Sequence, residues 1–135
     1  MCKLKPRVLS IDDEPGVGIL LKNIFEETGR FTVAVESDPF RAISQARAFK
    51  PDILLIDINM PGQTGIQIAV QLRAEPWLRF RPILFFTGLE TRETPRSLAL
   101  GDGPTEFLAK GVSSKVIVAT VDRLLAESTG VPAQI

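Results

Sequence analysis

The chain has 135 residues and a formal net charge of zero, because 16 Lys and Arg residues balance 16 Asp and Glu residues. This length suits one packed domain, and 44% hydrophobic with 24% charged residues is the composition of a globular protein rather than a disordered chain. The absence of histidine and the single Cys2 exclude Cys/His zinc sites, histidine general bases and an internal disulfide.

Charge and hydropathy also limit partners and location. A zero net charge gives no general attraction to nucleic acid or to an anionic membrane, so we expect neither as a partner. No apolar run approaches the roughly 18 residues that span a bilayer, and the N-terminus lacks the apolar core of a secretion signal. We therefore expect a cytoplasmic protein.

The chain begins with a strand pattern followed by a helix pattern. The short β-branched run at 8–11 ends at Asp12 and Asp13, as a strand ends at the carboxyl edge of a sheet. Apolar residues at helical spacing follow, with Pro15 suited to a first turn and Gly29 to a stop.

The same alternation is repeated in the next segment. Apolar and polar residues alternate over 31–36, which predicts a half-exposed strand. Asp38 and Pro39 suit the cap and first position of a second helix. The residues expected on its inner face are Phe40, Ile43 and Ala46.

A continuous apolar run at 53–56, closed by Asp57, predicts a central strand that is buried on both faces. The segment 64–74 follows with a helical pattern. The residues expected on one face of this helix are Ile66, Ala69 and Val70.

The second half of the chain holds two more predicted strands. One covers 83–86 and ends at Thr87, and the other covers 106–109 and ends at Lys110. Between them, 91–103 shows no clean apolar stripe and is rich in Gly and Pro, so we expect a short or irregular helix there.

A last helix follows the cap signal Ser113 and Ser114 and should end near Ala126. The predicted core is therefore about 7–126, and 127–135 forms a short tail, too short for an output domain. We expect a stand-alone single domain over 1–135. The apolar face of the last helix is expected to contain Ile117, Thr120, Val121, Leu124 and Leu125.

Alternating strands and helices predict an α/β fold, a doubly wound five-stranded parallel sheet with helices on both faces. Ligands of such sheets bind at the carboxyl ends of the strands. The reactive side chains that follow the predicted strands all lie at this edge: Asp12, Asp13, Asp57, Thr87 and Lys110.

Three carboxylates at one edge repel each other unless a cation is present, and oxygen ligands favour Mg²⁺. Each of these residues also has a structural interpretation that requires no functional role. The acids at 12–14 suit a helix N-terminus, Thr87 suits a turn, Lys110 a solvated strand end, and Phe107 the core. These interpretations do not explain why all the reactive residues end strands on one edge.

These motifs resemble the receiver domain of two-component response regulators. The resemblance covers about 7–126 and includes the acidic pair Asp12 and Asp13. It implies a flavodoxin-like sheet of strand order 2-1-3-4-5. The other matching positions are the stretch Asp57, Ile58, Asn59, Met60, Pro61 and Gly62, then Gly65, Thr87 with Gly88, Phe107 and Lys110.

The resemblance implies that Asp57 accepts a phosphoryl group from a sensor histidine kinase or a histidine phosphotransfer protein. Asp13, Asp57 and the backbone carbonyl of Asn59 would hold Mg²⁺, with Asp12 assisting through water. Lys110 would supply positive charge. These roles need positioning and charge neutralisation rather than further covalent chemistry.

The resemblance also implies a switch. Thr87 would hydrogen-bond the phosphoryl group, Gly88 would leave room for this, and Phe107 would turn inward. A downstream protein would read the face formed by the helix expected in 91–103, the strand 106–109 and the last helix. A homodimer is possible, and Asn59 and Leu89 would tune the loss of the phosphoryl group.

Three departures from the family pattern stand out. Gly111 replaces the usual proline after Lys110, so the peptide bond is expected to be trans. The segment 98–104 carries about two extra residues, and Phe107 replaces the more frequent tyrosine.

Three rival functions stay open on the sequence alone. A degenerate receiver would bind a partner without taking a phosphoryl group, and Gly111 is its best support. A phosphatase of the haloacid dehalogenase type would use Asp12 as nucleophile, although it needs Asp where Glu14 stands. A flavodoxin-type nucleotide binder is weaker, since no Gly-rich loop follows the first strand.

Overall fold

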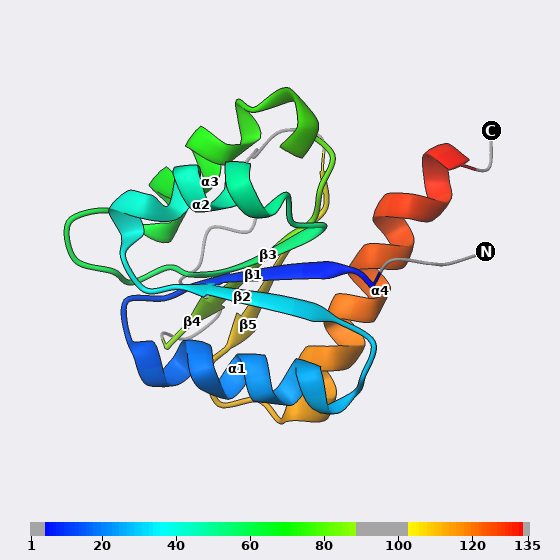
Figure 1. Ribbon diagram of the computed structural model, residues 1–135, viewed down its shortest axis with the longest axis horizontal. Helices are drawn as coiled ribbons and strands as arrows, with labels where there is room; N and C mark the ends of the chain where they lie inside the picture. The colour runs from blue at the N-terminus through cyan, green and yellow to red at the C-terminus, as the bar shows by residue number, and fades with distance from the viewer. Residues whose placement is uncertain (1–4, 89–102, 134–135) are drawn as a thin grey trace.

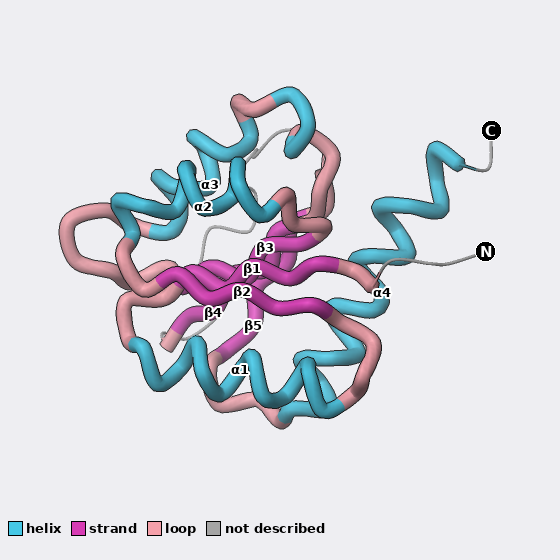
Figure 2. Tube along the Cα trace, viewed as in Figure 1, coloured by secondary structure: helices cyan, strands magenta, loops and turns pink. Residues whose placement is uncertain are grey.

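The computed structural model describes residues 5–88 and 103–133 (Figure 1; Figure 2). In these ranges a helix follows every strand except the fourth, after which most of the chain up to the fifth strand lies outside the described residues. The strands are β1 (Arg7–Ile11), β2 (Thr32–Glu36), β3 (Ile53–Asp57), β4 (Ile83–Thr87) and β5 (Thr105–Ala109). The helices are α1 (Pro15–Glu27), α2 (Ala42–Phe49), α3 (Gly65–Arg73) and α4 (Ser114–Ala133), with 3₁₀ turns η1 (Pro39–Arg41) and η2 (Pro76–Leu78).

The five strands form one parallel sheet in the order β2-β1-β3-β4-β5, which confirms the predicted fold and strand order. Helices α2 and α3 cover one face, and α1 and α4 cover the other (Figure 1). The strand order reverses between β1 and β3, and this is where doubly wound sheets place their ligands.

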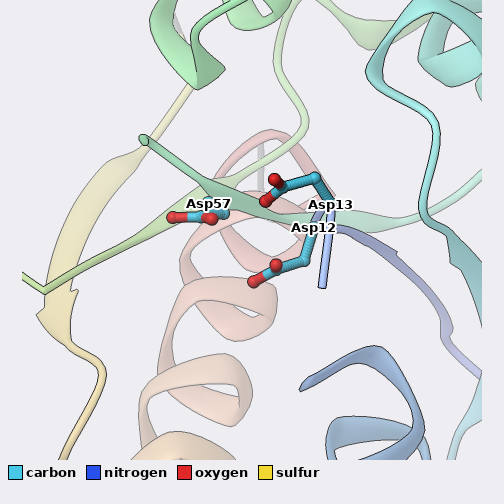
Figure 3. A group of neighbouring side chains, drawn as sticks. All are labelled: Asp12, Asp13 and Asp57. Carbon is cyan, nitrogen blue, oxygen red and sulfur yellow. The ribbon is translucent and has the colours of Figure 1, made fainter. Parts of the chain in front are cut away.

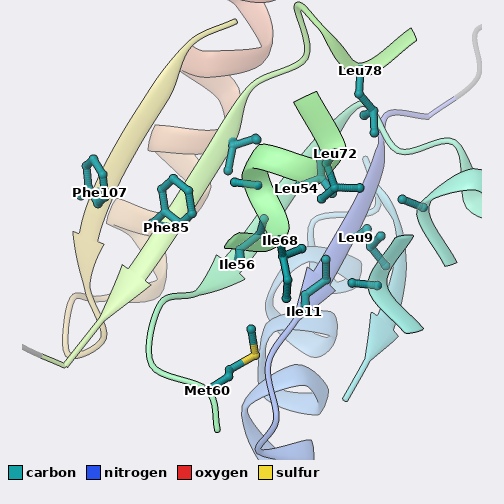
Figure 4. Packing of buried hydrophobic residues seen from close by; sticks show 14 residues of the cluster. Leu9, Ile11, Leu54, Ile56, Met60, Ile68, Leu72, Leu78, Phe85 and Phe107 are labelled. Atoms are coloured by element: carbon teal, nitrogen blue, oxygen red, sulfur yellow. The ribbon is translucent and has the colours of Figure 1, made fainter. Parts of the chain in front are cut away.

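The central strands β3 and β4 are buried along their whole length, as expected for strands covered on both faces. They divide the core into two layers. The layer between the sheet and the helices α2 and α3 contains Leu9, Ile56, Ile68 and Phe85 (Figure 4). The layer between the sheet and the helices α1 and α4 contains Phe25, Leu55, Leu84 and Val121. This packing fixes the carboxyl ends of the strands.

Local sequence signals explain where several helices begin. Pro15 is the first residue of α1, and Ser113 Oγ accepts a hydrogen bond from the Val116 amide at the start of α4. At α3, Thr64 and Gln67 form a capping box, in which each side chain accepts a hydrogen bond from the other residue's amide.

Two residues expected to face the core do not. Phe40 is 71% exposed because Asp38 caps a 3₁₀ turn rather than an α-helix, and this turn changes the direction of the following side chains. Val70 is 55% exposed. The buried stripe of α3 is instead formed by Gly65, Ile68, Ala69 and Leu72.

The last helix is longer than predicted, because α4 continues to Ala133 rather than ending near Ala126. The short or irregular helix expected in 91–103 falls mostly outside the described residues. In the described part of the chain, no helix is both long enough and apolar enough to cross a bilayer.

Candidate functional site

Four neighbouring strands bring the predicted residues to one edge of the sheet. Asp12 and Asp13 follow β1, Asp57 and Thr87 end β3 and β4, and Lys110 follows β5. Backbone hydrogen bonds continue past the strand ends, since the Lys110 amide donates to the Thr87 carbonyl at 3.0 Å. The five side chains therefore start from backbone that the sheet holds in place.

The three aspartates converge (Figure 3), and one carboxylate oxygen from each lies within 4.8 Å of the others. Asp12 and Asp57 are only 3% and 2% exposed, whereas Asp13 is half-buried. Two of the carboxylates accept backbone hydrogen bonds, Asp12 Oδ1 from the Glu14 amide at 2.9 Å and Asp57 Oδ1 from the Asn59 amide at 3.2 Å. These bonds orient the carboxylates toward the shared space.

Lys110 supplies the positive charge at this edge. Its Nζ lies 3.2 Å from Asp57 Oδ2 and 3.6 Å from Asp12 Oδ2. Every peptide bond of the described residues is trans, including the one to Gly111, and the ammonium still reaches Asp57. The missing proline therefore does not displace Lys110 from the site.

The charges of the cluster shift two pKa values. Burial, followed by repulsion from Asp57 and Asp13, raises the pKa of Asp12, although the Glu14 amide and Lys110 act in the opposite direction. Burial alone would lower the pKa of Lys110, but the carboxylates of Asp12 and Asp57 raise it above its ordinary value. Lys110 therefore stays charged at neutral pH.

The cluster fits a hard divalent cation. Asp57 Oδ2 is buried and, apart from the contact with the Lys110 ammonium, accepts no hydrogen bond from the described residues. One carboxylate oxygen of Asp57 lies within 4.8 Å of one oxygen each of Asp12 and Asp13, and all these possible ligand atoms are oxygens. This donor set is the one that Mg²⁺ prefers.

The two residues expected to form a switch lie on adjacent strands. Thr87 is 1% exposed at the end of β4, and an alanine methyl at Gly88 would have no atom of the described residues within 4 Å. Phe107 is buried on β5 and stacks on Phe85, with ring centroids 5.1 Å apart and an interplanar angle of 18°. Thr87 thus borders the site, whereas Phe107 lies in the core.

Sequence reasoning missed one side chain of the site. Glu14, interpreted as an acid of the helix N-terminus, places Oε1 3.5 Å from Lys110 Nζ. Its position directly after the acidic pair was a signal, because a β1–α1 loop this short keeps consecutive residues close to the site. Asn59 is an exposed residue next to the cluster.

Comparison with known proteins agrees with the fold. The family model of the response regulator receiver domain matches residues 8–122. The DNA-binding response regulator MtrA of Mycolicibacterium smegmatis is 30% identical over 99% of this chain and 57% of its own length. The alkaline phosphatase synthesis transcriptional regulatory protein PhoP of Bacillus subtilis is 31% identical over 93% of the chain and 50% of its own length.

The chain spans about half the length of these curated relatives, so the expectation that it binds no nucleic acid stays a prediction. A solved receiver domain of a histidine kinase from Syntrophus aciditrophicus is 29% identical with a TM-score of 0.77, covering 92% of each chain. The family match does not favour the phosphatase, nucleotide-binding or degenerate-receiver alternatives. The chain belongs to the receiver domain family of two-component response regulators.

Proposed function

We propose that Asp57 of this receiver domain accepts a phosphoryl group from a histidine kinase or a histidine phosphotransfer protein. The observation that carries the proposal is the position of the Asp57 carboxylate. It ends the central strand, is almost fully buried, and contacts the Lys110 ammonium at 3.2 Å beside two further carboxylates.

The chemistry follows from this arrangement. A carboxylate oxygen of Asp57 forms a bond to phosphorus while the P–N bond to the donor histidine breaks, and the electron pair of that bond leaves with the imidazole nitrogen. Lys110 neutralises charge on the phosphoryl oxygens, and the Thr87 hydroxyl donates a hydrogen bond to one of them. The chain itself catalyses the later hydrolysis of the acyl phosphate.

Asp12, Asp13, Asp57 and the backbone carbonyl of Asn59 would hold Mg²⁺. When bound, the ion would neutralise the three carboxylates and the incoming phosphoryl oxygens. Without it, the negative charge of the cluster opposes the approach of an anion.

The output is proposed to be docking of a downstream protein, or onward transfer in a phosphorelay. Thr87 would draw toward the phosphoryl group and Phe107 would turn into the space it leaves, changing the surface of β5 and α4; the segment 91–103, expected to share this face, lies mostly outside the described residues. Phosphorylation could also favour a homodimer through this face.

The experiment is intact-protein mass spectrometry after incubation with Mg²⁺ and acetyl phosphate. The expected result is one phosphoryl adduct, which is absent from Asp57→Asn and retained by Asp38→Asn, an isosteric change at an exposed carboxylate outside the group of Asp12, Asp13 and Asp57. An adduct that persists in Asp57→Asn would contradict the assignment. Mg²⁺ binding without any adduct would instead identify a degenerate receiver.

A further inference from the structure

One carboxylate at the edge of the site is not explained by phosphoryl transfer or by metal binding. Among the described residues, Glu14 is not part of the carboxylate group formed by Asp12, Asp13 and Asp57, and its side chain is 66% exposed. Its Oε1 nevertheless contacts Lys110 Nζ at 3.5 Å, about as close as Asp12 Oδ2 at 3.6 Å. The same ammonium thus connects a solvent-facing acid to the buried Asp57.

The backbone holds Glu14 in this position. It is the N-cap residue of α1, its amide donates to Asp12 Oδ1 at 2.9 Å, and its carbonyl accepts from the Val17 amide at 3.0 Å. The backbone of Glu14 is therefore fixed by the aspartate cluster on one side and by the helix on the other. Only the side chain can move, and Lys110 is within its reach.

The formal charges show what this contact does. The carboxylates of Asp12, Glu14 and Asp57 contact the ammonium of Lys110, and Asp13 adds a fourth negative charge to the cluster, so a bound divalent cation would still leave a single negative charge in excess. Of the four, Glu14 is the one on the solvent side. A donor that approaches from solvent meets this charge before it reaches Asp57.

Resting on the proposed phosphoacceptor function, we propose that Glu14 is a specificity-determining residue that disfavours small, highly charged phosphodonors relative to less charged ones. A dianion is repelled more strongly than a monoanion by the same carboxylate. A histidine-borne phosphoryl group can offset the repulsion with positive charge on the surface of its own protein. The effect is electrostatic and therefore weakens as salt is added.

The test compares Glu14→Gln with the unmodified chain, using saturating Mg²⁺ and two donors. Acetyl phosphate is a dianion at neutral pH, and phosphoramidate is a monoanion. Glu14→Gln should raise the phosphorylation rate constant about two- to fivefold with acetyl phosphate and less with phosphoramidate. The ratio between the donors should return toward that of the unmodified chain at high ionic strength.

Glu27→Gln is the matched control. It makes the same charge change at the other end of α1, about 20 Å away along the helix, at a residue outside the site. It should leave the ratio between the donors unchanged. An equal change with both donors in Glu14→Gln, or the same change in Glu27→Gln, would overturn the proposal.

A second readout needs no phosphorylation. Mg²⁺ affinity measured by calorimetry at low salt should fall about two- to fivefold in Glu14→Gln and stay constant in Glu27→Gln, because one negative charge near the ion is lost. If the unmodified chain binds Mg²⁺ but accepts no phosphoryl group, the proposed function fails and this proposal with it. If it is phosphorylated but the donor ratio is unaffected by Glu14→Gln, only the role of Glu14 fails.

Discussion

At the scale of single residues, the site places acidic side chains where little solvent reaches them. Asp12 and Asp57 are almost fully removed from solvent, yet both are acids, and one ammonium lies within reach of both. Such a cluster costs free energy in the absence of a cation. The raised pKa of Asp12 reflects this cost, because burial and the neighbouring carboxylates disfavour the charged form of its side chain.

This raised pKa predicts the pH dependence of metal binding. The folded chain holds a proton on Asp12 at pH values above the ordinary 3.8, where the unfolded chain has lost it. The stability of the metal-free chain therefore falls as the pH rises from 3.8 through the raised pKa. Mg²⁺ binds only the deprotonated site, so the increase in Tm that it causes should grow over the same range.

Thermal unfolding at a series of pH values, with and without Mg²⁺, measures both effects. Asp12→Asn is the control, because it removes the titrating group and should flatten the pH dependence of the metal effect in this range. A Tm increase that is constant with pH, or larger in acid, would show that protons and Mg²⁺ do not compete for Asp12.

At the scale of elements, the approach of α3 to β3 depends on a residue without a side chain. A methyl group at Gly65 would overlap the Asp57 carbonyl oxygen and touch the Ile56 side chain. Gly65 begins α3, and its amide donates to the Ile58 carbonyl at 3.0 Å. The glycine therefore sets the distance between the helix and the end of the phosphoacceptor strand.

Gly65→Ala is predicted to lower the free energy of unfolding by about 1–3 kcal/mol, because backbone or helix must shift to admit the methyl group. Gly16→Ala is the matched control, since the second residue of α1 has open space around it. That change should raise the free energy of unfolding by about 0.5 kcal/mol. Urea denaturation measures both, and a loss of similar size in the two variants would show that the contact at Gly65 is not the cause.

Periodicity predicted the strands well, because a buried strand such as β3 is a continuous apolar run that ends at a charged residue. It predicted the inner face of α2 less well. Phe40 precedes the first α-helical turn and lies in a 3₁₀ turn, where the helical spacing does not apply. The choice between the two geometries depends on tertiary contacts that a sequence pattern does not contain.

The site was predictable residue by residue because each reactive group directly follows or ends a strand. The contact between Glu14 and Lys110 was not predictable, since these residues are 96 positions apart and follow different strands, β1 and β5. The end of α4 was missed for another reason. Beyond Ala126 the sequence contains Gly130 and Pro132, which usually end helices, yet the helix continues to Ala133.

At the scale of the whole molecule, a buried arginine joins segments that lie far apart in the sequence. Arg73 ends α3 and is 9% exposed. Its guanidinium donates hydrogen bonds to four backbone carbonyls. The acceptors are Leu78 at 2.9 Å, Arg79 at 3.2 Å, Pro104 at 3.1 Å, and Arg81.

Arg73→Lys is predicted to lower the free energy of unfolding by about 2 kcal/mol, because one ammonium cannot donate to all of these buried carbonyls and leaves some of them unpaired. Arg41→Lys, at an exposed arginine, should change it by less than about 0.5 kcal/mol. Chemical denaturation of both variants measures the difference. A cost for Arg73→Lys no larger than that for Arg41→Lys would show that the network does not stabilise the fold.

The order of the sheet has a further consequence for the use of this molecule as a component. Acids, nucleophile, hydroxyl and ammonium come from β1, β3, β4 and β5, which form one uninterrupted row, while β2 forms the outer border and carries none of them. The Asp12 amide donates to the Glu36 carbonyl at 3.2 Å, so the backbone of β2 supports the site and only its solvent-facing side chains can be changed without altering the reaction centre. We therefore expect that a new partner specificity can be introduced at the side chains of Thr32–Glu36 that are not buried, with Val33 left unchanged.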